Sequence, residues 1–280
     1  MKAAAFEYVM AHSLPEALAA LGPQASGAKP IAGSQSMGPM LNLRLARPSQ
    51  VIDVSRIAEL RSVSETGEAI RVGAAVTHAE IEDGLHPLLR HAYLQFVAGG
   101  IAYRAIRNRG TIGGSLAHAD PAADWPLALS ALDARIELAG VGGKTRVVRA
   151  ADFMLGAFTT LLEEGEIISA VLLPKLGPSL RWGYYKLCRK TGEFAHASAA
   201  AAFDARVGLA RIVLGALDGP PVSLDELAQR IARHGADGAG PEALAKAVAG
   251  AMPNADEIDR QMHTATLERC LQQAFGVSKR

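Results

Sequence analysis

The sequence has few cysteines, few aromatic residues and no strong charge of either sign. Only Cys188 and Cys270 are present among 280 residues, and they lie far apart along the chain. Two thiols exclude a disulfide framework and any iron–sulfur cluster held by this chain alone, because a cluster normally needs four thiolates. We therefore predict that both cysteines are small, buried apolar residues.

The charge balance argues against polyanionic partners. Charged residues make up 20% of the chain and the formal net charge is +1, so neither nucleic acid nor an acidic membrane surface is indicated. No apolar run approaches the roughly 20 residues of a membrane span. The first residues also soon reach a charged side chain, Glu7. We predict a cytoplasmic protein without a transmembrane segment.

A metal site is not indicated either. His78, His86 and His91 lie near one another in the sequence, but no carboxylate or cysteine recurs around them with the spacing of metal ligands. We interpret them as surface or helix-capping histidines.

With hydrophobic residues at 49%, the chain is long and apolar enough to form about two globular domains.

A glycine-rich stretch, residues 109–124, joins two segments that both have helical character. Gly113 and Gly114 can adopt backbone conformations denied to other residues and leave main-chain N–H groups uncovered. A strip of such donors entering a helix is an anion site, most often for phosphate. The alternative is an ordinary turn in which Asp120 caps a helix with Pro121 at its first position.

A second turn, residues 33–39, has the same chemistry. It follows a strand that begins at Pro30 and precedes a helical stretch and a strand over residues 51–54, which together form a βαβ unit whose turn faces a crevice. Taken alone, it could equally be a helix-capping turn. Two glycine–serine turns about 75 residues apart, each entering a helix, fit a diphosphate held from both sides better than either turn does alone.

The rest of the chain divides at residues 174–179, which resemble a linker between domains. Before it, the pattern predicts a strand over residues 70–76, a β-hairpin over 134–148 and a strand over 166–174. After it, the pattern predicts three strands, over residues 181–187, 195–203 and 206–215, and then helices up to residue 275.

These residues resemble a known family, the FAD-binding medium subunits of molybdenum hydroxylases, which include carbon monoxide dehydrogenase, nicotine dehydrogenase, quinoline oxidoreductase and the xanthine dehydrogenase group. Residues 32–36, followed by 43–46 and Asp53, are similar to its first flavin motif. Residues 111–115, followed by 119–121 and Asp124, are similar to its second. We call residues 32–36 the first motif and residues 111–115 the second motif.

The resemblance extends over essentially the whole chain, with two departures. The first motif usually has a second glycine where Ser34 stands. Glu193, within a segment that is similar to the family's C-terminal domain entry, replaces an aspartate that is common there. The implied fold is α+β: an FAD-binding domain of the PCMH type over residues 1–176, with subdomains of about 1–56 and 57–176, and a C-terminal domain over 177–280 with a three-stranded antiparallel sheet and helices.

The resemblance also implies a site for non-covalently bound FAD, with no catalytic or metal-binding residue required from this chain. The two motifs would bind the diphosphate and its neighbours, four further residues would contact FAD, and one residue of the C-terminal domain would approach the flavin ring. In that order, these residues are Ala32, Gly33, Ser34, Gln35, Ser36, Thr111, Ile112, Gly113, Gly114 and Ser115; Ile101, Asp124, Ile168 and Lys186; and Phe194.

The implied function is electron transfer within a heteromeric molybdenum hydroxylase, expected as a dimer of heterotrimers. A large partner subunit would carry the molybdenum cofactor and the substrate pocket, and a small one would carry 2Fe-2S clusters. FAD would pass their electrons to an external acceptor such as NAD⁺, oxygen or a quinone. One alternative is a self-contained flavoprotein oxidoreductase, which would need an acid or base facing the flavin. A non-catalytic nucleotide-binding protein is another.

Overall fold

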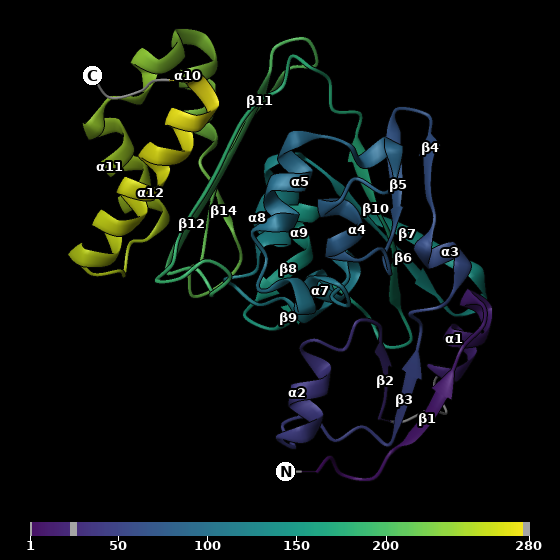
Figure 1. The fold of residues 1–280 in the computed structure, drawn as a ribbon. Coiled ribbons are helices and arrows are strands. Elements are labelled where there is room, and N and C mark those ends of the chain that lie inside the picture. Colours follow the sequence, from purple (N-terminus) through teal and green to yellow (C-terminus); the bar gives the residue numbers. More distant parts are fainter. Residues whose placement is uncertain (1, 23–26, 277–280) are drawn as a thin grey trace.

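The computed structural model describes residues 2–22 and 27–276 and arranges them around three main β-sheets with helices between and beside them (Figure 1). This confirms the predicted α+β class. Among the helices of these ranges, none combines the length and the apolar character that a membrane span requires.

The N-terminal part is a small parallel sheet of three strands, and α2 (Met37–Asn42), which follows the first motif, connects two of them. Its strands are β1 (Glu7–Met10), β2 (Ala28–Ile31) and β3 (Gln50–Asp53), in the order β1-β3-β2. The helix α1 (Leu14–Ala20) begins where Ser13 accepts a hydrogen bond from the N–H of Glu16. Because α2 joins β2 to β3, the predicted βαβ unit is present, and the first motif follows the carboxyl end of β2.

The middle part is a five-stranded antiparallel sheet covered by helices, with strand order β4-β5-β10-β6-β7. The predicted hairpin and the predicted strand over 166–174 are both found. The elements are α3 (Ala58–Arg61), β4 (Val63–Thr66), β5 (Ala69–Gly73), α4 (His78–Glu82), a 3-10 turn (Pro87–Leu89), α5 (Ala92–Gly99), α6 (Arg104–Arg107), α7 (Ile112–His118), α8 (Asp124–Ala131), β6 (Arg135–Gly140), a 3-10 turn (Val141–Gly143), β7 (Lys144–Arg149), α9 (Ala150–Phe153), β8 (Met154–Gly156), β9 (Thr159–Thr160) and β10 (Ile167–Pro174).

The C-terminal part contains the three predicted strands and a short fourth one that the sequence did not indicate. The strand order is β11-β12-β13-β14, all antiparallel, and β14 has only two residues. The elements are β11 (Arg181–Leu187), β12 (Ala197–Asp204), β13 (Leu209–Gly215), β14 (Val222–Ser223), α10 (Asp225–His234), a 3-10 turn (Gly235–Ala239), α11 (Pro241–Ala251) and α12 (Glu257–Phe275).

Both faces of the C-terminal sheet are covered. In β12, Ala199 and Ala201 pack against the helices α10–α12, for example against Leu267. Ala200 and Ala202 point the other way and belong to the large core around α5 and α8. In Figure 1, α5 and α8 accordingly lie between this sheet and the five-stranded one. The helices that precede and follow the second motif are thus held between two sheets, which gives the site a rigid base.

Three local expectations need correction. The stretch before the second motif is two helices, α5 and α6, separated by residues 100–103. Asp120 does not cap a helix at Pro121; it accepts a hydrogen bond from the N–H of Ala122 within a turn, and α8 begins only at Asp124. Cys270 is buried as predicted, but Cys188 is partly exposed.

Candidate functional site

The two predicted motifs lie against each other in the structure through the backbone of Gly33. A Cβ on Gly33 would lie 1.9 Å from the carbonyl oxygen of Arg109 and 2.8 Å from the Cα of Gly110. No side chain fits at such a distance, so glycine is required here for close approach of two backbone segments. The residue therefore joins the first motif to the residues that lead into the second.

The first motif is the part of the site with free backbone donors. Within the described residues, the N–H groups of Gly33, Ser34, Gln35 and Ser36 donate to no protein acceptor. Ser34 has a φ of 64°, in the left-handed region that glycine adopts more easily, and the Gln35 side-chain amide donates to the Gly33 carbonyl at 2.9 Å. Successive N–H groups around a left-handed residue form a concave anion site of the kind that binds phosphate.

The second motif is built differently from what its glycines suggest. The N–H of Gly113 donates to Ala74 O at 2.9 Å, and that of Gly114 donates to the Thr111 hydroxyl at 3.1 Å. Gly113 is buried, and a Cβ there would lie 2.5 Å from the Cβ of Ala74. The expected strip of bare N–H groups is therefore wrong for this motif. Gly113 serves close packing, while Gly114 and Ser115 lie toward the surface.

Ile168 is connected to the second motif through the backbone of Ala74. The residue after it, Ser169, accepts a hydrogen bond on its carbonyl oxygen from the N–H of Ala74 at 3.0 Å. The register between β10 and β6 shifts at this point, which marks a bulge beside the site. Ile168 itself is buried in the main core.

Asp124 and Lys186, both predicted FAD contacts, form a largely buried ion pair. The Lys186 ammonium lies 2.9 Å and 3.2 Å from the two carboxylate oxygens of Asp124 and also donates to Gly100 O at 2.7 Å. The Tyr184 hydroxyl donates to the same carboxylate at 2.6 Å, and burial, together with this carboxylate, holds the pKa of Tyr184 well above its usual range. The cluster ties β11 of the C-terminal part to the start of α8.

Ile101 lies beside this ion pair, in the segment between α5 and α6. Arg107 holds the segment by donating to the carbonyl oxygens of Ile101 and Ala102 at 3.0 Å and 2.9 Å, and its guanidinium makes two bonds to Glu82. A Cβ on Gly192 would lie 2.6 Å from Ala102 O, so the loop between β11 and β12 packs on the same segment.

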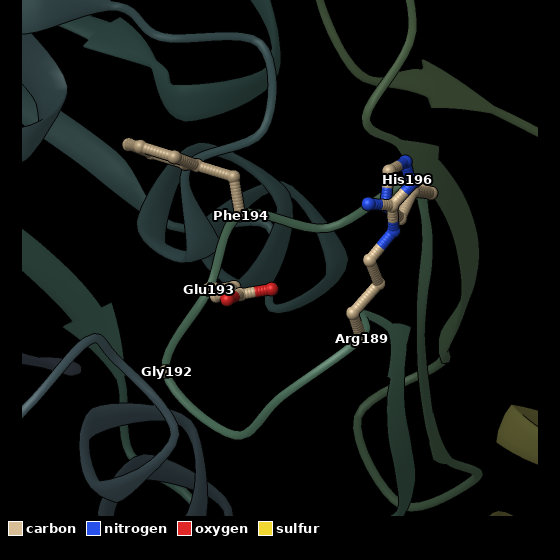
Figure 2. Close-up of a pocket in the computed structure, with 5 residues that line it drawn as sticks. All are labelled: Arg189, Gly192, Glu193, Phe194 and His196. Carbon is tan, nitrogen blue, oxygen red and sulfur yellow. The ribbon is translucent and has the colours of Figure 1, made fainter.

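Phe194 lies on the loop between β11 and β12 and is 70% exposed. The loop surrounds an open pocket lined by Arg189, Gly192, Glu193, Phe194 and His196. Figure 2 shows the Phe194 ring extending to the opposite side of the loop from Arg189 and His196. An aromatic ring this exposed is available for contact with another molecule.

The histidines only partly follow the sequence interpretation. His91 caps α5 as expected, by accepting a hydrogen bond from the N–H of Tyr93. His78 is not a surface residue, because it is buried and its Nδ1 accepts a hydrogen bond from the indole N–H of Trp125 at 3.0 Å. Burial lowers the pKa of His78 to about 4, and the nearby Arg107 guanidinium contributes to the shift. No local pattern in the sequence indicates this pair, which joins residues 47 positions apart.

The lowered pKa of His78 should make the folded protein sensitive to mild acid. A histidine takes up a proton more readily in the unfolded chain, at about 6.5, than in the folded one at about 4. The contribution of His78 to stability is therefore fully present above about pH 6.5 and is lost as the pH falls from there toward 4. Between about pH 7 and pH 5, we expect protonation of His78 in the unfolded chain to lower the free energy of unfolding by about 2 kcal/mol.

Urea unfolding at both pH values would measure this loss. The variant His78→Asn lacks the titrating group, so its free energy of unfolding should fall by about 2 kcal/mol less than that of the wild type over the same pH interval. Equal losses in the two proteins would contradict the assignment.

Residues 4–176 match the family described as "FAD binding domain in molybdopterin dehydrogenase". The chain is 40% identical over 195 residues to the carbon monoxide dehydrogenase medium chain of Hydrogenophaga pseudoflava, over 70% of this chain and 68% of that one. It is 38% identical over 219 residues to the nicotine 6-hydroxylase medium subunit of Paenarthrobacter nicotinovorans, over 77% and 76% of the two chains.

Two solved structures have the same fold over almost the full length. A chain of quinoline 2-oxidoreductase from Pseudomonas putida 86 superposes with a TM-score of 0.85 at 31% identity, over 99% of both chains. A chain of reconstituted CO dehydrogenase from Oligotropha carboxidovorans gives 0.88 at 30% identity, over 99% of this chain and 100% of that one.

Proposed function

Because the chain belongs to the FAD-binding medium subunits of molybdenum hydroxylases, we propose that it relays electrons within such a complex, from 2Fe-2S clusters of a small partner subunit to an external acceptor. The molybdenum cofactor and the substrate pocket would lie on a large partner subunit, in a dimer of heterotrimers. The observation that carries the proposal is the contact between the first motif and the residues leading into the second, which brings together two motifs that are about 75 residues apart in the sequence.

The residues of this site fit an FAD diphosphate. The four free N–H groups of residues 33–36, around a left-handed Ser34, are suitable donors for its oxygens. From the second motif we assign the Ser115 hydroxyl to the same group, with the exposed, side-chain-free Gly114 leaving room for it, while Thr111, Ile112 and Gly113 shape the wall behind them. When bound, FAD supplies the redox chemistry, since its ring can take up and release electrons.

The remaining predicted contacts suit the other parts of the cofactor. We assign Ile101 and Ile168 to apolar contact, the Asp124–Lys186 pair to polar contact, and Phe194 to the flavin ring. The chain's own part is then to bind, orient and partly shield FAD. An electron relay requires no acid or base from the chain, whereas a self-contained oxidase would require one facing the flavin.

Purification of the chain with and without its partners tests this function. The chain alone should carry FAD but oxidise none of the compounds named in its relatives' names, such as carbon monoxide, nicotine, quinoline and caffeine. Native extracts should yield a complex with two further subunits, molybdenum and 2Fe-2S clusters, detected by elemental analysis and electron paramagnetic resonance. A homo-oligomer that oxidises substrate by itself would contradict the proposal and support the self-contained flavoprotein.

A further inference from the structure

We propose that His78 and Trp125 form a positioning pair that fixes the two FAD motifs relative to the Asp124–Lys186 ion pair. The inference rests on the proposed function, since it concerns how the FAD site is held. Neither residue lies in a motif, and neither needs to touch FAD. Their role follows from what lies on each side of them.

On one side, the imidazole of His78 packs on the backbone that joins the two motifs. A Cβ on Gly110 would lie 2.8 Å from both Cδ2 and Nε2 of His78, and Gly33 approaches the Cα of the same glycine. Gly110 is thus in contact with the first motif and with the His78 ring. The main chain supports this contact, because the N–H of His78 donates to Gly110 O at 2.9 Å.

On the other side, His78 is bonded to the helix that carries the ion pair. Trp125 is fully buried, and its indole N–H reaches Nδ1 of His78 at 3.0 Å. It is the second residue of α8 and directly follows Asp124, whose carboxylate binds Lys186. A displacement of the Trp125 ring would therefore move the start of α8 and, with it, the ion pair.

The chemistry of the two rings makes this bond specific. An indole N–H can only donate, so Nδ1 of His78 must be unprotonated and the ring proton must lie on Nε2. If either ring loses its polar atom, the other keeps a buried polar atom without a partner, which is costly in an apolar core. The pair thus has one favourable arrangement, and that arrangement sets the distance between Gly110 and α8.

FAD titration of the full-length apo chain, followed by the quenching of flavin fluorescence, tests the pair. His78→Leu and Trp125→Phe should each weaken FAD binding about tenfold, because one unpartnered polar atom would shift the site. His78→Asn should stay within about threefold of the wild type, since its amide oxygen can replace Nδ1 as acceptor. The double variant His78→Leu/Trp125→Phe should bind no more weakly than the worse single variant, because the two residues act as a unit.

The controls separate positioning from folding. Far-UV circular dichroism and the melting temperature of each apo variant identify any variant that fails to fold; if His78→Leu is one, Trp125→Phe decides, because it leaves the His78 ring intact and keeps an aromatic ring at position 125. Folded variants with wild-type FAD affinity, or additive losses in the double variant, would overturn the positioning role. A wild-type chain that binds no FAD would instead overturn the proposed function.

Discussion

Replacing Gly33 with alanine should reduce FAD affinity by at least about tenfold. The new methyl group would lie 1.9 Å from the carbonyl oxygen of Arg109, and this neighbour is backbone that cannot rotate away. The loop that carries the first motif would have to separate from the residues leading into the second. Overpacking costs about 1–3 kcal/mol, and a clash with fixed backbone should lie in the upper part of this range, at about 2–3 kcal/mol, which corresponds to about thirtyfold to 150-fold in binding.

Two other substitutions in the chain serve as controls for this result. Gly250 lies near the end of α11, where an added Cβ would point into open space, so Gly250→Ala should leave FAD binding unchanged. Ser34→Gly should also retain FAD, because it relieves the left-handed backbone at φ 64°. The measurement is the FAD-to-protein ratio after gel filtration. A full complement of flavin in Gly33→Ala would show that the contact between the two segments does not matter for binding.

The sequence predicted the two motifs but not the contact between them. Glycine, serine and threonine at short spacing identify a phosphate-binding turn locally, because the chemistry is in neighbouring residues. That Gly33 meets Arg109 and Gly110 depends on how the parallel sheet docks on the helices, which no local pattern encodes. The same limit explains why the sequence predicts a free N–H on Gly113. In the structure this N–H donates to the carbonyl oxygen of Ala74, which is distant in the sequence.

The buried partners of the site were the least predictable from sequence. His78 and Trp125 are separated by 47 positions, and Lys186 and Asp124 by 62. Periodicity places a residue on the face of its own helix or strand, but it does not say which distant side chain lies opposite.

The C-terminal sheet illustrates the same limit in its fold. Residues 199–202 are all alanine, so strand β12 shows no alternation from which its two faces could be distinguished. The structure shows why none is needed, since both faces are covered, one by α10–α12 and the other by the core around α5 and α8. Small residues on both faces allow helices to approach closely from either side.

Replacing Lys186 with methionine should lower the free energy of unfolding by about 3 kcal/mol or more, because the variant leaves the buried Asp124 carboxylate without its counter-charge. Asp124→Asn in addition should recover part of this loss, since the amide carries no charge. The matched control is Lys175→Met, which breaks the exposed pair with Glu65 and should cost less than about 1 kcal/mol.

Urea unfolding of the apo chain would measure all three variants, and equal effects of Lys186→Met and Lys175→Met would contradict the role of burial.

The Lys186–Asp124 pair also bears on how FAD is recognised. Because the charges of Lys186 and Asp124 compensate each other at 2.9 Å, we expect these side chains to present hydrogen-bonding groups to FAD rather than a net cation. We therefore propose that the free N–H groups of the first motif, rather than this pair, attract the diphosphate. We therefore expect Lys186→Met to weaken FAD binding mainly through displacement of β11, an effect that the double variant with Asp124→Asn should partly reverse.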